Sequence, residues 1–279
     1  MAQPLAERLR PKTLDDYIGQ KHLVGPGAVL RKMIDAGRIS SFILWGPPGV
    51  GKTTLAQIIA NKLETPFYTL SAVTSGVKDV RDVIEKARSN RFFSQASPIL
   101  FIDEIHRLNR SVEEILYSAM EDFALDLVMG KGTGATSVRI NLASFTLIGA
   151  TTRPGSLSAP LRDRFLINHH MEFYEPDELK HIITRAAGIL NIEIEESGAA
   201  EIARRSRGTP RIANRLLKRI RDFAQIKNSA ITAEIASEAM EALHVDAAHV
   251  MEEGVIVRNG GAELVDEINE KGFSNLKED

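Results

Sequence analysis

Cysteine is absent from this 279-residue sequence, tryptophan occurs once, and no apolar run is long enough to form a membrane helix. The lack of cysteine excludes disulfides, thiolate zinc sites and cysteine nucleophiles. A membrane helix needs about 18 consecutive apolar residues, and the N-terminal AQPLAERLRPK lacks the pattern of a signal peptide. We therefore predict a cytoplasmic protein without membrane segments.

The sequence also lacks an excess of either charge. It has 35 Lys and Arg residues against 37 Asp and Glu residues, which gives a net charge of −2. Overall charge therefore gives no reason to expect a polyanionic partner, and only local patches can. A content of 43% hydrophobic and 26% charged residues is that of an ordinary globular protein. At roughly 100–200 residues per domain, the chain has room for one large domain or two of moderate size.

Charge is nevertheless distributed unevenly along the chain. Residues 1–40 contain seven basic and four acidic residues, and residues 200–228 contain nine basic and two acidic residues. Residues 246–279 have the opposite balance, with three basic and nine acidic residues. Within the middle stretch the apolar residues recur at helical spacing: Ile212, Leu216, Ile220 and Phe223. This spacing leaves the arginines on the outer faces of a helix, where they either bind anionic ligands or form only a solvated surface.

Short apolar segments alternate with helix-like segments over the first two thirds of the sequence. The expected strands are residues 42–45, 67–70, 99–103 and 145–150, and the expected helices are residues 54–63, 77–89 and 111–121. Buried strands that alternate with helices are typical of a parallel sheet covered by helices on both faces. The predicted fold class is therefore α/β.

Two further segments interrupt this alternation. Residues 125–129 and 137–142 flank the glycine-rich GKGTG of residues 130–134. Strand-like segments on either side of such a turn predict a β-hairpin over residues 125–142.

Only helices are expected after Phe173, at residues 176–190, 197–206, 210–226 and 232–243. Thr209 as the cap and Pro210 in the first turn mark the start of the third helix. The expected units are an α/β domain over residues 1–172, an all-helical lid over residues 173–245 and an acidic tail over residues 246–279.

A glycine-rich motif follows the first expected strand and precedes a helix. It fits the pattern G-x-x-x-x-G-K-[ST] and is followed by Thr54: Gly46, Pro47, Pro48, Gly49, Val50, Gly51, Lys52 and Thr53. Such a loop curves its backbone N–H groups around phosphate oxygens, and the helix N-terminus adds its positive dipole end. We expect Lys52 to reach the β- and γ-phosphates, and the Thr53 hydroxyl to bind Mg²⁺.

The apolar strand at residues 99–103 ends in the acidic pair Asp103 and Glu104. In ATPases with a glycine-rich phosphate loop, an aspartate at this place binds the metal ion. The glutamate beside it can polarise a water for attack on the γ-phosphate; the alternative is a pair that is merely solvated. Residues 61–64 read NKLE and fail the guanine-binding pattern N-K-x-D, so ATP with Mg²⁺ is the expected ligand.

Together with three further motifs, these residues resemble the AAA+ ATPases. The motifs are GATTR at residues 149–153, LRDRF at residues 161–165 and GTPR at residues 208–211. Within this class, two parts of the sequence resemble two different families. About residues 4–90, with DDYIGQ and LSAVTSGVK, resemble the RarA (MgsA) recombination ATPases. About residues 97–246, with FIDEIHRLNRSVEEILYSAMED and RGTPRIANRLLKRIRDFA, resemble the RuvB family of Holliday-junction branch-migration motors.

The resemblance implies nucleotide contacts outside the phosphate loop. It implies an adenine pocket lined by Leu9, Arg10, Tyr17 and Ile18. It also implies that Thr152 is sensor 1, and that Tyr174 and Arg211 reach the nucleotide from the helical lid, Arg211 as sensor 2. The alternative for Tyr17 and Tyr174 is ordinary packing, and for Thr152 a role only in satisfying backbone groups at a strand end. The histidines show no metal-ligand spacing, and none is expected to act in the site.

The resemblance further implies a homo-oligomer, a ring of six subunits. Arg164 would be the arginine finger supplied to a neighbour's ATP, with Glu121, Asp122 and Phe123 near the subunit junction. The alternative for Arg164 is a structural ion pair. The hairpin at residues 125–142 would dock a RuvA-like partner protein.

The acidic stretch at residues 246–279 stands where the RuvB family has a winged-helix DNA-binding domain, and it is too short for that domain. DNA affinity rises with the number of phosphates that a protein neutralises. We therefore expect the chain alone to bind DNA weakly and with strong salt sensitivity.

These observations lead to a hypothesis of function with two alternatives. The leading hypothesis is an ATP-hydrolysing motor of DNA recombination and repair that drives RuvB-like branch migration. One alternative is RarA-like action at stalled replication forks. The other is a nucleotide-switched adaptor that hydrolyses ATP slowly.

Overall fold

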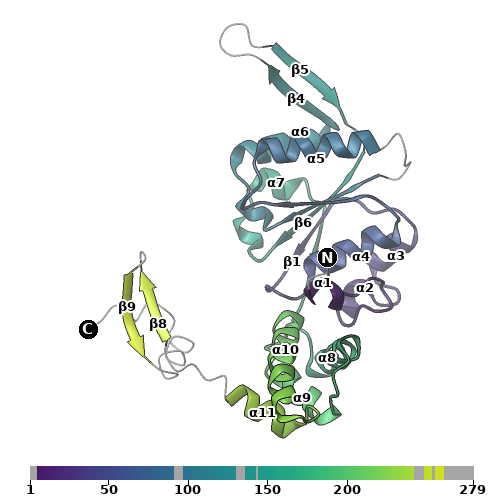
Figure 1. Ribbon diagram of the computed structural model, residues 1–279. Coiled ribbons are helices and arrows are strands. Elements are labelled where there is room, and N and C mark those ends of the chain that lie inside the picture. The colour runs from purple at the N-terminus through teal and green to yellow at the C-terminus, as the bar shows by residue number, and fades with distance from the viewer. Residues whose placement is uncertain are drawn as a thin grey trace.

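The computed structural model describes residues 5–90, 97–129, 136–142, 144–241, 248–252 and 255–260. Figure 1 shows a sheet covered by helices and, below it, a bundle of helices that begins after the last strand of the sheet. The predicted fold class, a parallel sheet flanked by helices and followed by a helical lid, is confirmed.

The central sheet has five parallel strands in the order β2-β3-β6-β1-β7. Their bounds are β1 (Phe42–Trp45), β2 (Phe67–Ser71), β3 (Ile99–Asp103), β6 (Thr146–Thr151) and β7 (Ile167–His170). The first four agree with the predicted strands to within one residue at each end. Strand β7 was not predicted, because its sequence INHH contains no apolar run.

Alternate side chains of these strands enter two separate hydrophobic cores. Phe42 and Phe101 pack with α4, whereas Ile43 and Ile102 pack with α5 and α6 on the opposite face. The helices of this domain are α1 (Leu5–Leu9), α2 (Lys21–Val24), α3 (Val29–Asp35), α4 (Lys52–Lys62), α5 (Val77–Asn90), α6 (Arg110–Glu121) and α7 (Ala159–Asp163). Burial of both faces explains why the strands read as continuous apolar runs.

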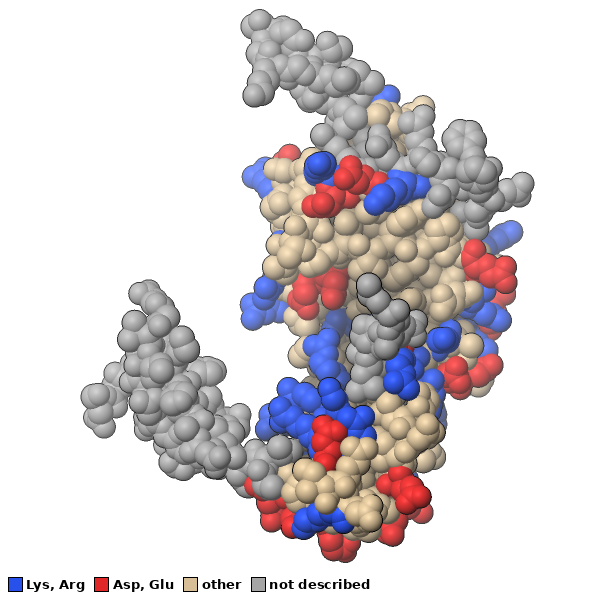
Figure 2. All heavy atoms as spheres, in the orientation of Figure 1, with Lys and Arg blue, Asp and Glu red and all other residues tan. Residues whose placement is uncertain are grey.

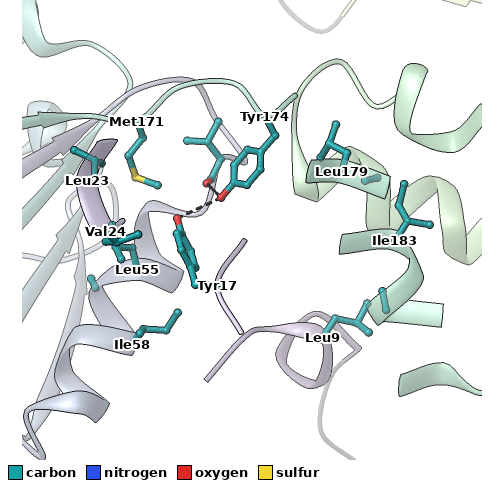
Figure 3. Close-up of a cluster of buried hydrophobic side chains, with 14 of the residues drawn as sticks. Leu9, Tyr17, Leu23, Val24, Leu55, Ile58, Met171, Tyr174, Leu179 and Ile183 are labelled. Atoms are coloured by element: carbon teal, nitrogen blue, oxygen red, sulfur yellow. Dashed lines mark hydrogen bonds between the residues drawn. The ribbon is translucent and has the colours of Figure 1, made fainter. Parts of the chain in front are cut away.

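The core on the α4 side continues into the lid and the N-terminal segment. Figure 3 shows Leu9, Leu55 and Ile183, from three distant parts of the chain, around the buried side chains of Tyr17 and Tyr174. The N-terminal segment therefore packs between the two bodies of the molecule.

Strands β4 (Ala124–Met129) and β5 (Thr136–Asn141) form an antiparallel hairpin that agrees with the predicted residues 125–142 to within one residue at each end. In Figure 1 the hairpin projects away from the sheet, beyond α6, on the side opposite the lid. Arg139 and Asp122 form an ion pair at its base, with an N–O distance of 2.5 Å. The hairpin is thus presented as a separate arm.

The lid consists of α8 (Pro176–Leu190), α9 (Glu196–Arg204), α10 (Pro210–Lys227) and α11 (Ala233–Glu241). Residues 242–243, predicted as the end of the last helix, lie outside the described residues. Thr209 is the N-cap of α10 and Pro210 is in its first turn, as predicted. The Thr209 hydroxyl makes no capping hydrogen bond, however, and instead donates a hydrogen bond to the carbonyl of Ser206.

The buried stripe of α10 differs by about one residue from the predicted stripe. The buried residues are Ala213, Leu217, Ile220 and Ala224, whereas Ile212, Leu216 and Phe223 are only partly buried. Small alanines face inward because α8 and α11 pack closely against this helix, and the size of the apolar residues in the sequence does not reveal this packing.

Part of the stretch predicted only as an acidic tail forms a second hairpin. It consists of β8 (Ala248–Glu252) and β9 (Val255–Gly260), which pair antiparallel. Residues 261–279 lie outside the described residues. Among the described helices, none combines the length and the apolar character that crossing a membrane requires.

Candidate functional site

The loop between β1 and α4 is shaped by glycines. Gly46, Gly49 and Gly51 have φ values of 152°, 86° and 99°, which favour glycine. A Cβ on Gly46 would lie 2.2 Å from the carbonyl oxygen of Met171, and one on Gly49 would lie 2.9 Å from Cβ of Arg211. The loop therefore approaches both the end of the sheet and the lid more closely than any other residue type allows.

Lys52 opens α4 with a buried side chain. Its Nζ donates hydrogen bonds to the carbonyl oxygens of Gly46 and Pro47, both at 2.9 Å. Burial lowers the pKa of Lys52, and the carboxylates of Glu104 and Asp103 oppose that shift. The ammonium group is thus held directly under the loop.

The acidic pair lies where β3 ends. The Glu104 N–H donates a hydrogen bond to Oδ1 of Asp103 at 3.1 Å. Burial and the neighbouring Glu104 carboxylate raise the pKa of Asp103, and Lys52 acts against this rise. Glu104 itself has a left-handed backbone with φ of 52°, which turns its side chain away from the strand direction.

Glu104 contacts two side chains from neighbouring segments. Thr152 donates a hydrogen bond to Glu104 Oε2 at 3.4 Å, and Nδ1 of His106 lies 3.4 Å from the same oxygen. His106 Nδ1 is also 2.8 Å from Oγ1 of Thr151, which accepts a hydrogen bond from the Arg153 N–H. Burial lowers the pKa of His106. His106, for which no role in the site is expected, thus touches the glutamate predicted to be the base and does not itself line the cavity described below.

A cavity of about 330 Å³ lies between the loop, the end of β3, the N-terminal segment and the lid. This volume is within the usual range for small-molecule sites, about 300–1,000 Å³. It brings together most of the predicted site residues: Leu9, Arg10, Tyr17, Ile18, Pro48, Gly49, Gly51, Lys52, Thr53, Thr54, Asp103, Glu104, Tyr174 and Arg211.

Tyr17 and Tyr174 form one wall of the cavity. The Tyr174 hydroxyl donates to the carbonyl oxygen of Val50 at 3.2 Å and lies 3.3 Å from the Tyr17 hydroxyl (Figure 3). Burial raises the pKa of Tyr174 to about 12 and raises that of Tyr17 as well. Both tyrosines line the cavity and belong to the core, so the packing alternative and the nucleotide-contact prediction are compatible.

Some predicted residues do not line this cavity. Within the loop, Gly46, Pro47 and Val50 lie behind it. Thr152 reaches it only through Glu104.

Arg164 also lies outside the cavity of its own chain. Its Nη2 is 2.8 Å from Glu121, its Nη1 donates to the carbonyl of Pro160 at 2.7 Å, and its guanidinium lies 4.3 Å from the Tyr117 ring centre. The predicted junction residues Glu121, Asp122 and Phe123 follow α6 beside it and are likewise outside the cavity.

Sequence reasoning missed several residues that line the cavity: Pro11, Asp16, Ile182, Arg185, Pro210 and Asn214. Most belong to the lid or the N-terminal segment and stand in no phosphate-binding motif. Arg185 of α8 donates a hydrogen bond to the carbonyl of Leu9 at 3.0 Å across 176 positions of sequence. Only the three-dimensional packing reveals such a contact, whereas Asp16, Pro210 and Asn214 stand in the segments DDYIGQ and RGTPRIANRLLKRIRDFA that carry the family resemblance.

Glycine-rich loops of this form, placed between a strand of a parallel sheet and the following helix and closed by a separate helical lid, characterise the P-loop nucleotide-binding proteins of the AAA+ class. The model of the Holliday junction DNA helicase RuvB P-loop domain matches residues 9–171, and that of the RuvB AAA lid domain matches residues 174–246. The chain therefore belongs to the RuvB family. The first match includes the N-terminal stretch that also resembles RarA.

Individual relatives agree with this assignment. Two proteins named Holliday junction branch migration complex subunit RuvB, from Fusobacterium nucleatum subsp. nucleatum and Streptomyces avermitilis, are each 50% identical to the chain over 246 and 250 residues. These matches cover 87% and 88% of this chain, and 72% and 68% of the two relatives. The solved Thermotoga maritima RuvB Holliday junction branch migration motor is 41% identical with a TM-score of 0.73, and the match covers 94% of this chain and 80% of that one.

Proposed function

We propose that this chain hydrolyses ATP to drive branch migration of Holliday junctions, the activity named for its RuvB relatives. The observation that carries the proposal is the cavity in which the phosphate loop, the Asp103–Glu104 pair and Arg211 of the lid meet. Family membership favours this function over a RarA-like ATPase or a nucleotide-switched adaptor. The DNA substrate would place the protein in the cytoplasm.

In this proposal the phosphate end of the cavity performs the chemistry. Lys52 holds the β- and γ-phosphates, and Glu104 orients a water and accepts its proton. The water oxygen bonds to the γ-phosphorus as the bond from that phosphorus to the β–γ bridging oxygen breaks, which releases ADP and phosphate. Thr152, as sensor 1, holds the Glu104 carboxylate through its hydrogen bond.

The oxygen donors at this end suit Mg²⁺, since Thr53 and Asp103 line the same cavity and hydroxyl and carboxylate oxygens are its usual ligands. We assign the metal to these two side chains. When bound, the ion neutralises phosphate charge.

Residues at the other end of the cavity would bind the nucleoside. Leu9, Ile18 and Tyr17 offer apolar surface to adenine, and Tyr174 supports the loop from the lid. Arg211 would act as sensor 2, because its side chain lies against Gly49 of the phosphate loop. Domain closure and nucleotide binding would thereby be linked.

We further propose that Arg164 acts on the ATP of a neighbouring subunit in a homo-oligomeric ring of six. A head-to-tail interface of this kind closes into a ring when the rotation permits. Within its own chain Arg164 is held by Glu121, so the finger would exchange this ion pair for the neighbour's phosphate.

DNA and a partner protein complete the proposal. The α/β unit of residues 1–172 would present the hairpin at residues 125–142 to a RuvA-like protein, and the lid would comprise residues 173–245. Figure 2 shows Lys and Arg side chains gathered on the part of the lid nearest the sheet domain. The lid sequence has exposed arginines at Arg207, Arg215 and Arg219, in a row whose fourth member, Arg211, lies against the phosphate loop. This row is the candidate surface for weak contact with DNA phosphates.

The experiment that tests the function is steady-state ATP hydrolysis with four-way junction DNA and a RuvA-like protein. We expect strong stimulation by the two together and little by linear duplex. A variant in which a short Gly-Ser turn replaces residues 125–140 should keep basal hydrolysis and lose the stimulation. Stimulation by single-stranded ends instead would support the RarA-like alternative, and no stimulation would support the adaptor.

A further inference from the structure

One side-chain oxygen beside the cavity has no hydrogen-bond partner in the described part of the chain. Asn214 of α10 lines the cavity, and its side-chain Oδ1 is buried without a hydrogen bond. Buried side-chain acceptors are nearly always hydrogen-bonded in folded proteins. An unpaired acceptor on a residue that lines a ligand site is therefore a candidate to receive a hydrogen bond from the ligand.

The position of Asn214 along α10 tells which half of a nucleotide it faces. Arg211 lies against Gly49 of the phosphate loop. Asn214 follows it by three residues, which is about 4.5 Å of helix rise. Beyond it, Arg185 of α8 lines the same cavity and holds the carbonyl of Leu9. Asn214 thus lies between the phosphate end and the N-terminal segment, where the nucleoside half would be.

Other polar side chains of this region are already engaged. Arg10 donates to Gln57, Asp16 accepts from Thr13, and the hydroxyls of Tyr17 and Tyr174 lie within hydrogen-bond distance of each other. Among the described side chains that line the cavity, Asn214 Oδ1 is the buried polar atom for which no hydrogen bond is found.

We propose that Asn214 Oδ1 accepts a hydrogen bond from the nucleoside half of ATP. This inference rests on the proposed function and refines its ligand site. ATP offers such a donor at the adenine 6-amino group and at the two ribose hydroxyls. Guanine has a carbonyl in place of the amino group, so a contact with the amino group would also favour ATP over GTP.

The test measures the affinity of the unmodified chain for ATP and for three analogues, each of which lacks one donor. These are purine riboside triphosphate, 2′-deoxy-ATP and 3′-deoxy-ATP. We expect one analogue to bind about 5- to 10-fold more weakly than ATP, the usual effect of one lost hydrogen bond. The analogue that is affected identifies the donor.

Variants at Asn214 remove the other partner of the proposed hydrogen bond, so that side chain and ligand donor are deleted separately and together. N214A and N214L should bind ATP about 5- to 10-fold more weakly and should no longer distinguish that analogue from ATP. The matched control is Q225A, which changes an exposed residue of the same helix and should behave as the unmodified chain. Because the readout is a ratio of affinities within each variant, a general loss of stability does not produce the expected result.

Equal affinity of the unmodified chain for all four ligands would overturn the assignment of Asn214. So would an unchanged preference in both Asn214 variants. Neither result would affect the proposed motor function, which fails instead if ATP binds but junction DNA with a RuvA-like protein does not stimulate its hydrolysis. No binding of ATP at all would overturn both.

Discussion

The two ends of the cavity are built in different ways. At the phosphate end, one loop and the first turn of α4 supply most of the groups, and Asp103 and Glu104 lie at the end of β3 in the same sheet. At the nucleoside end, Leu9, Arg185 and Asn214 come from three separate helices that only the folded chain brings together.

This difference has a physical origin. Phosphate is bound largely by backbone N–H groups, whose direction a short glycine-rich segment sets by itself. A nucleoside needs apolar walls and single polar contacts, which depend on how the lid meets the sheet domain. Changes at the phosphate end should therefore abolish binding or chemistry, and changes at the nucleoside end should weaken affinity by smaller factors.

The largest effect is expected at Lys52. K52A removes the ammonium group that lies under the loop, so nucleotide binding and hydrolysis should both be lost. Isothermal titration with ATP measures the binding. K62A, at the exposed end of the same helix, is the matched control and should bind as the unmodified chain. Tight ATP binding by K52A would refute the assignment of the phosphate end.

A comparable loss of turnover is expected for Arg164, although it lies outside the cavity of its own chain. R164A should lower ATP hydrolysis by about 10³-fold, the effect typical of an arginine finger. The control R162A, an exposed arginine of the same helix, should retain activity.

Mixing R164A with the separately inactive E104Q tests whether the finger acts between subunits. Some interfaces in the mixture then pair an intact finger with an intact base, so part of the activity should return. If every mixing ratio stays inactive, action between subunits is contradicted.

The difference between local segments and contacts made by distant segments also limits what the sequence could predict. Strands such as Ile99–Asp103 were predicted because burial on both faces makes them continuous apolar runs. Strand β7 lacks such a run, and β8 and β9 fall in a stretch for which only the charge was predicted.

The site divides in the same way. Lys52 and Asp103 belong to motifs with fixed spacing, whereas Arg185 has no local pattern and Asn214 is placed at the cavity only by the packing of the lid. His106 was set aside because metal spacing was the criterion, while its actual contact is with Glu104.

A smaller effect is expected for the arginines on the outer face of the lid. The double variant R215A/R219A should reduce the slope of log affinity against log salt for duplex DNA by about 2, since each phosphate contact contributes close to one unit. Fluorescence anisotropy at several salt concentrations measures this slope. K62A/R38A removes two exposed charges elsewhere and should leave it unchanged. Nanomolar binding of a four-way junction by the chain alone would contradict the weak surface proposed here.

The smallest effect is expected where the lid holds the N-terminal segment. R185M removes the hydrogen bond to the Leu9 carbonyl and should weaken ATP binding about 3- to 10-fold, with the maximal rate nearly unchanged. K180M, also on α8, loses only an exposed ion pair with Glu196 and should leave the affinity unchanged. A fall in maximal rate without a change in affinity would show that Arg185 serves chemistry rather than the nucleoside.

The claim that this cavity hydrolyses ATP is tested most directly by E104Q. An amide keeps the size of the side chain and cannot accept the proton of the attacking water. E104Q should therefore bind ATP with nearly unchanged affinity and hydrolyse it about 10²- to 10⁴-fold more slowly in a single-turnover measurement. Hydrolysis by E104Q at a rate close to that of the unmodified chain would contradict the account.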